Sequence, residues 1–64
     1  MNTKEAVEYL KDKGHNFKVA TLQQYRWMGK GPVYIRNKVK NSIRYEEEDL
    51  NNWITELETE ERVD

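Results

Sequence analysis

The chain has 64 residues, of which 36% are hydrophobic and 36% are charged, and its formal net charge is −1. A domain of this size buries only about 60% of the surface of its unfolded chain, which leaves room for one small core and little room for a catalytic pocket. The lack of cysteine excludes a disulfide framework, the single His15 leaves too few ligands for a closed zinc site, and the short apolar runs exclude a membrane-spanning helix.

The first predicted helix covers Lys4–Lys13. Thr3 or Asn2 can cap its N-terminus, because either side-chain oxygen can accept a hydrogen bond from the first turn. Gly14 follows the last turn and is placed to adopt a left-handed conformation. An apolar stripe at i, i+1 and i+4 predicts the buried face: Ala6, Val7 and Leu10.

The second predicted helix covers Lys18–Met28, with Asn16 as the best local candidate for its N-cap. Apolar residues recur at every third position, and we expect them to face the first helix: Val19, Leu22 and Tyr25. The glycines and the proline of residues 29–32 end this helix.

Two strand-like segments follow, at residues 32–36 and 42–45, and the basic segment 37–41 between them predicts a hairpin tip. The alternation of side chains places Val33 and Ile35 on one face of the first strand. It also predicts that Arg36 and Arg44 share the other face of the hairpin.

The third predicted helix covers Glu46–Glu58, and an acidic tail predicted to be frayed follows at residues 59–64. Four consecutive acids open this helix and suit the positive end of its dipole. Because consecutive helical residues point in different directions, these acids do not converge on a metal ion or a substrate. We therefore expect no metal, no cofactor and no enzymatic activity. An amphipathic stripe predicts the buried face: Leu50, Trp53, Ile54 and Leu57.

The near-zero net charge hides a division of the chain at Tyr45. Residues 1–44 carry ten basic and three acidic side chains, a sum of +7, whereas residues 45–64 carry one base and nine acids, a sum of −8. Residues 13–45 contain no acid. Such an asymmetry is typical of a surface that binds a polyanion, joined to an acidic segment.

The order of two short helices, a basic hairpin and a closing helix is typical of a winged helix-turn-helix domain. Residues 21–32, Thr-Leu-Gln-Gln-Tyr-Arg-Trp-Met-Gly-Lys-Gly-Pro, resemble the second-helix signature of the phage excisionases and AlpA-like regulators, a branch of the MerR-like group. Residues 43–45 and 49–54 resemble the wing strand and closing helix of that family, and residues 3–10 resemble its first helix. Lys18 stands where the family usually has a capping serine.

The resemblance implies a mostly helical α+β fold, a small winged helix-turn-helix domain over residues 2–58. It also implies a sequence-specific, architectural DNA-binding protein that directs a phage-type integrase toward excision, in the cytoplasm of a bacterial host. The expected partners are double-stranded DNA, an integrase and further copies of the chain on adjacent sites, without a membrane. In the second helix, which would be the recognition helix, the candidate DNA contacts are Lys18, Thr21, Gln23, Gln24, Arg26 and Trp27. In the wing they are Arg36, Asn37, Lys38, Lys40, Asn41 and Arg44.

Several roles stay open at this stage. The two glutamines can read adenine or form an ordinary solvated surface, and the basic hairpin can line a minor groove or protect a sheet edge from aggregation. Trp27 is expected either to pack beneath the hairpin or to lie against the sugar-phosphate backbone. An AlpA-like transcription regulator is the close alternative function. A protein-binding module that uses the acidic third helix is the alternative from another class.

Overall fold

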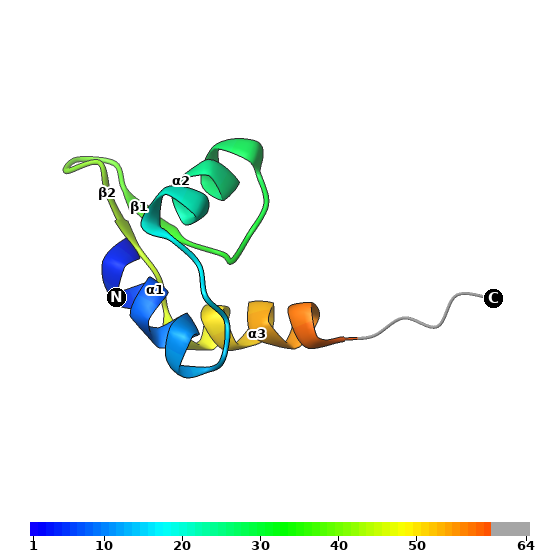
Figure 1. Ribbon diagram of the computed structural model, residues 1–64. Coiled ribbons are helices and arrows are strands. Elements are labelled where there is room, and N and C mark those ends of the chain that lie inside the picture. The colour runs from blue at the N-terminus through cyan, green and yellow to red at the C-terminus, as the bar shows by residue number, and fades with distance from the viewer. Residues whose placement is uncertain (60–64) are drawn as a thin grey trace.

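The computed structural model describes residues 1–59, which form three helices and one two-stranded antiparallel sheet (Figure 1). The elements follow one another as α1 (Thr3–Asp12), α2 (Val19–Met28), β1 (Ile35–Asn37), β2 (Ser42–Arg44) and α3 (Glu47–Glu58). The predicted α+β class, mostly helical, is confirmed. The helices in residues 1–59 are all too short and too polar to cross a membrane. The frayed tail predicted for residues 59–64 lies, apart from Thr59, outside the described residues.

Helix α1 begins with a complete capping box. The Asn2 side chain accepts a hydrogen bond of 2.8 Å from the Glu5 backbone N–H, and the Glu5 carboxylate accepts one of 3.0 Å from the Asn2 backbone N–H. Of the two capping residues predicted, the structure uses Asn2. Gly14 has the positive φ expected of it, at 89°. The reciprocal pair satisfies two backbone donors that the first turn would otherwise leave unpaired.

Replacing Asn2 with alanine removes the acceptor for the Glu5 N–H. We expect this change to lower the free energy of unfolding by about 1 kcal/mol, the usual cost of losing an N-cap. Urea unfolding followed by circular dichroism measures the effect, and Asn2→Ser is the control because serine keeps a capping oxygen. Equal stability of Asn2→Ala and the unmodified chain would contradict this role.

Helix α2 begins after Lys18, in place of the predicted cap at Asn16. Lys18 is the N-cap residue, with extended φ and ψ, and its side chain makes no capping hydrogen bond. Gly29 ends the helix in the left-handed conformation at φ 75°. Gly31 also has a positive φ, 93°, and an added Cβ would lie 3.0 Å from the Tyr25 Cβ. The two glycines therefore turn the chain sharply from α2 toward the sheet.

The register of the hairpin sets which side chains share a face. Ile35 pairs with Arg44, Arg36 with Ile43, and Asn37 with Ser42. Directly paired residues of an antiparallel sheet lie on the same face. Arg36 therefore lies on the face of Ile43, and Arg44 lies on the opposite face, so the expectation that the two arginines share a face is wrong.

The inner face of the hairpin is aromatic. Tyr45 is completely buried, and its ring centroid lies 6.3 Å from that of the half-buried Tyr34. Val33 and Ile35, which the alternation places on the other face, are 65% and 37% exposed. Neighbouring side chains of a strand point to opposite faces, so either Tyr34 or the pair Val33 and Ile35 can face inward. Tyr34 takes the inward position because its larger ring packs against Tyr45.

The core is shared by the three helices and the end of the hairpin. Its buried members are Ala6, Leu10, Leu22, Tyr45, Leu50, Trp53 and Ile54. The predicted stripe on α3 is thus confirmed at three positions, but Leu57 is 44% exposed because it lies in the last turn, beyond most of the core. Phe17, Tyr25 and Trp53 form an aromatic cluster, with ring centroids 5.0 to 6.3 Å apart.

Two contacts join distant parts of the chain to this core. The Met1 backbone nitrogen donates to the Tyr45 carbonyl over 2.8 Å, and the Tyr45 N–H donates to the Met1 carbonyl over 2.6 Å. At the other end of the molecule, His15 Nε2 lies 3.0 Å from Glu58 Oε1. The first residue therefore continues the edge of the hairpin, and the connection between α1 and α2 is tied to the end of α3.

Candidate nucleic-acid interface

The outer face of α2 is a stripe of four exposed side chains. They follow the spacing i, i+3, i+4 and i+7, which places them on one side of a helix: Ala20, Gln23, Gln24 and Trp27. The buried residue of α2, Leu22, points the other way, toward α1. We call these four residues the outer face of α2.

Trp27 does not pack beneath the hairpin. Its side chain is 88% exposed, whereas Trp53 is buried in the core. The prediction that Trp27 packs beneath the hairpin is therefore wrong.

The two flanking polar candidates of α2 differ in exposure. Lys18 is exposed just before the first turn, and Thr21 is half-buried beside the outer face. A cation at this end of a helix lies beside the positive end of the helix dipole. The combination favours an anion, such as a phosphate group, over a cationic partner.

Arg26 is turned toward the interior of the molecule. Its Nη1 donates to the Tyr45 hydroxyl over 2.7 Å and to Thr3 Oγ1 over 3.3 Å. Its guanidinium carbon lies 5.9 Å from the ring centroids of both Tyr34 and Tyr45. Arg26, one of the candidate DNA contacts, therefore has a structural role that joins α2, α1 and the hairpin.

The hairpin tip carries two lysines on a turn closed by asparagine. The Asn37 Oδ1 accepts hydrogen bonds from the Val39 and Lys40 backbone N–H groups, at 2.9 and 3.0 Å. Asn41 ends the turn with φ 54°, a left-handed conformation that asparagine tolerates better than most residues. The two asparagines predicted as DNA contacts thus shape the turn that exposes Lys38 and Lys40.

The hairpin arginines lie on opposite faces and have different surroundings. Arg44 lies 3.6 Å from the Glu46 carboxylate, in a pair that is exposed on both sides and therefore contributes little to stability. Arg36 is exposed on the face of Ile43. Within residues 1–59, no carboxylate lies within 4 Å of the charged groups of Lys18, Arg36, Lys38 or Lys40.

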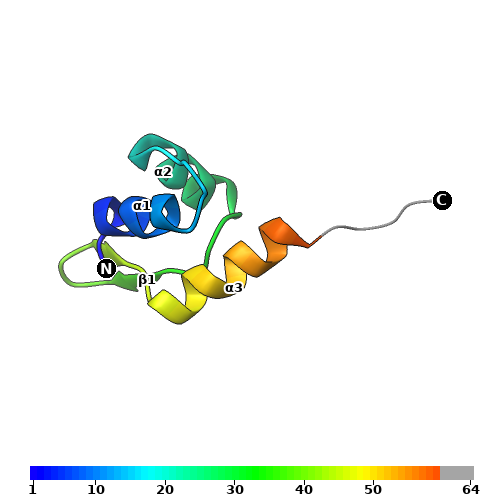
Figure 2. The same ribbon diagram turned by 60° about the horizontal axis from the view of Figure 1, so that its bottom comes forward.

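Basic and acidic surfaces are separated in space as well as in sequence. In both Figures 1 and 2 the hairpin tip and the C-terminal end of α3 project to opposite sides of the molecule, while α2 and α3 pack together through Tyr25 and Trp53. The acids of residues 46–58 lie on α3 or just before it. A polyanion that contacts the hairpin tip is therefore kept away from Glu56 and Glu58 at the C-terminal end of α3.

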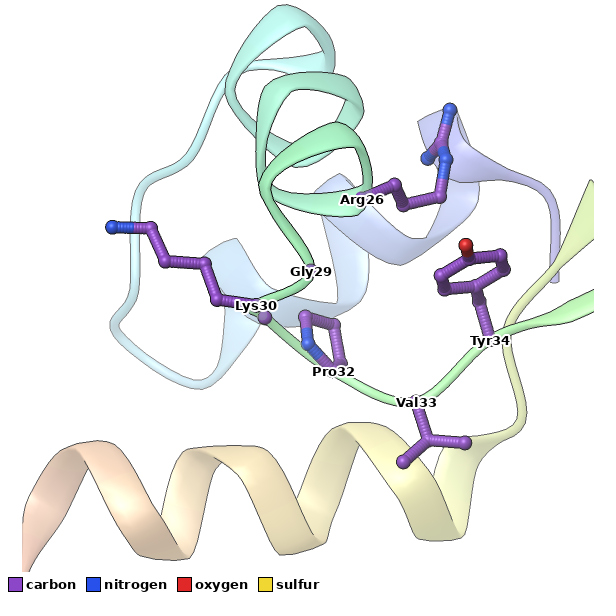
Figure 3. A pocket seen from close by; sticks show the side chains of 7 residues that line it. Arg26, Gly29, Lys30, Pro32, Val33 and Tyr34 are labelled. Carbon is purple, nitrogen blue, oxygen red and sulfur yellow. The ribbon is translucent and has the colours of Figure 1, made fainter.

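The turn between α2 and the hairpin forms an open hollow of about 290 Å³. Figure 3 shows Arg26 above the Tyr34 ring, while Lys30 points away from both. The Lys30 Nζ lies 5.0 Å from the centroid of the Tyr25 ring on that other side. The hollow is lined by Arg26 and residues 29–34, and it connects the two halves of the candidate interface.

The described residues contain no group of three or more side chains that could hold a metal ion. The comparisons with known proteins gave no match: no protein-family model, no curated protein and no solved structure resembles this chain significantly.

Proposed function

We propose that this chain is a winged helix-turn-helix protein that binds double-stranded DNA in a sequence-specific manner. Helix α2 lies in the major groove, and the hairpin, which acts as the wing, contacts the neighbouring backbone or minor groove. The width of the major groove admits a single α-helix, and α2 offers an outer face of polar and aromatic side chains for this contact.

The separation of charge carries this proposal. The side chains presented by α2 and the hairpin tip are neutral or basic, since residues 13–45 contain no acid. Double-stranded DNA carries one negative charge per about 1.7 Å of its axis, so this surface releases counterions when it binds. The C-terminal end of the acidic helix α3 projects to the side opposite the hairpin tip, and its repulsion by the phosphates would orient the protein on the duplex.

The resemblance to excisionases extends the proposal to an architectural role. Several copies would bind neighbouring sites, bend the DNA and direct a phage-type integrase toward excision. A transcription regulator of the AlpA type would use the same surface on a different target. Footprinting on natural DNA separates these functions, because repeated sites at an integration end favour excision and a promoter site favours regulation.

A protein-binding module built on α3 has less support. The stripe that would form its interface includes Leu50, Trp53 and Ile54, and these residues are buried in the core. What α3 offers to a partner is its acidic outer side.

Changing both Gln23 and Gln24 to alanine tests base reading by α2. A glutamine amide can donate to and accept from adenine at the same time, and such a bidentate pair contributes about 1–3 kcal/mol of discrimination. We expect the double variant to keep its affinity for random duplex DNA and to lose a factor of about 5 to 150 for its preferred site. Selection of bound sequences from a random duplex pool, followed by titration of the selected duplex, measures both quantities.

The control for this experiment is Asn52→Ala, which removes an exposed amide of α3, whereas Asn51 is kept because its Oδ1 accepts a hydrogen bond of 2.6 Å from the Tyr9 hydroxyl. We expect this variant to leave the selected sequence unchanged. If the Gln23→Ala, Gln24→Ala variant selects the same sequence with the same preference, the two glutamines do not read bases. If the unmodified chain binds no duplex at low salt, this result contradicts the proposed function.

A further inference from the structure

Trp27 is the most exposed large aromatic side chain among the described residues, and the core does not account for it. Its exposed fraction is 88%, whereas the other tryptophan, Trp53, is 9% exposed. An exposed indole leaves a large apolar surface in water, which indicates a binding role more strongly than an exposed leucine would.

The neighbours of Trp27 on the outer face of α2 are polar or small. Gln23 lies one turn earlier, and long side chains on a helix lean back over the preceding turn. The indole therefore covers the same part of the surface as Gln23. The nearest turn toward the N-terminus carries Ala20, so the outer face is a row of two amides with one ring at its end.

The major groove offers one kind of apolar group to such a ring. Each base pair displays hydrogen-bonding atoms there, and thymine alone adds a C5-methyl group. Residues four apart on a helix lie about 6 Å apart along its axis, which corresponds to roughly two base-pair steps of about 3.4 Å. Trp27 would thus meet a base one or two steps from the base that Gln23 reads.

We infer that Trp27 is a specificity-determining residue that contacts a thymine methyl group in the major groove, beside the base read by Gln23. This inference rests on the proposed function. It adds that the preferred site contains a thymine at a fixed short distance from the adenine selected by the glutamines. The preference for thymine at this base pair comes from apolar contact with its methyl group and not from a hydrogen bond.

The test compares thymine with deoxyuridine, which differs from it only by the lack of the C5-methyl group. The probe is the duplex recovered by the unmodified chain from a random pool, synthesised again with single deoxyuridine substitutions at each thymine. We expect one or two positions to lower the affinity about fourfold each, the equivalent of ~0.8 kcal/mol for one buried methyl group. Substitutions outside the footprint are expected to have no effect.

The variants decide whether Trp27 makes the contact. Trp27→Ala is expected to bind thymine and deoxyuridine duplexes with equal affinity, whereas Trp27→Phe is expected to keep part of the preference for thymine. Met28→Ala, at the 51% exposed neighbouring position, is the matched control and is expected to keep the full preference for thymine. Because Trp27 lies outside the core, unchanged thermal unfolding confirms that Trp27→Ala is folded.

Three results would overturn the inference. The first is equal binding of thymine and deoxyuridine duplexes by the unmodified chain. The second is a deoxyuridine effect of the same size in Trp27→Ala. The third is self-association of the unmodified chain that Trp27→Ala abolishes, which would assign the ring to a second copy. All three differ from a complete lack of duplex binding at low salt, which would contradict the proposed function.

Discussion

Replacing Lys38 and Lys40 together with alanine is expected to weaken binding to duplex DNA by about 50- to 100-fold at 0.1 M salt, whatever the base sequence. Each lysine that neutralises a phosphate releases about 0.9 counterions, so each lost contact costs roughly a factor of eight at this salt concentration. The two lysines are exposed on the turn that Asn37 closes. Titration at several salt concentrations should also show a slope of log K against log salt that is shallower by about 2.

The matched control is Lys11→Ala with Lys13→Ala, which removes the same charge from the end of α1. This pair lies away from the hairpin tip (Figure 1), and we expect the slope to change by much less than 1. Equal losses for the two pairs would show that net charge alone drives binding. A loss confined to one selected sequence would assign Lys38 and Lys40 to base reading.

Replacing Tyr45 with alanine is expected to lower the free energy of unfolding by about 3–5 kcal/mol, the usual cost of removing a buried aromatic ring. Tyr45 is completely buried, packs against Tyr34, and accepts a hydrogen bond of 2.7 Å from Arg26. A domain of this length has a total stability on the order of 3–10 kcal/mol, so the variant should be largely unfolded or close to it at room temperature. Circular dichroism during urea unfolding measures the loss.

Tyr45→Phe separates packing from hydrogen bonding at the same position. It keeps the ring and removes the acceptor for the Arg26 guanidinium, and we expect a loss of about 1–3 kcal/mol because a half-buried charge loses a partner. A stability of Tyr45→Phe equal to that of Tyr45→Ala would mean that the ring itself contributes little. Unchanged stability of Tyr45→Ala would contradict the described core.

The helices could be predicted because their signals are local. The spacing of Ala6 and Leu10 in α1, and of Leu50, Trp53 and Ile54 in α3, defines one face of a helix without reference to the rest of the chain. The N-cap of α2 could not be predicted in the same way. Asn16 is the better capping residue, but the helix begins after Lys18, and the adjacent Phe17 packs with Tyr25 and Trp53.

The faces of the hairpin could not be predicted because the strand has apolar side chains on both sides. Val33 and Ile35 alternate with Tyr34, and the pattern alone does not say which set is buried. A shift of register by one residue moves every side chain to the other face. Here the Tyr34–Tyr45 pair sets the register, and this pair depends on contacts between residues far apart in the chain.

For the candidate interface, the structure bears only on the exposure of its side chains. Exposure of Gln23, Gln24, Lys38 and Lys40 agrees with the sequence pattern. Arg26 was a candidate DNA contact because it is basic and lies in α2. Its inward position depends on Thr3 and Tyr45, which lie 23 and 19 residues away in the chain, so the pattern of α2 gives no sign of it. Trp27, by contrast, shares the spacing of Gln23 and Gln24, and this spacing agrees with its exposure.

The proposal that α2 and the hairpin form one DNA-binding surface is tested most directly by amide chemical-shift mapping of the full chain, with a duplex recovered from a random pool. We expect the largest shifts at residues 20–27 and 36–41, with small shifts along Glu47–Glu58. Shifts concentrated on α3, or no shifts at low salt, would contradict the account.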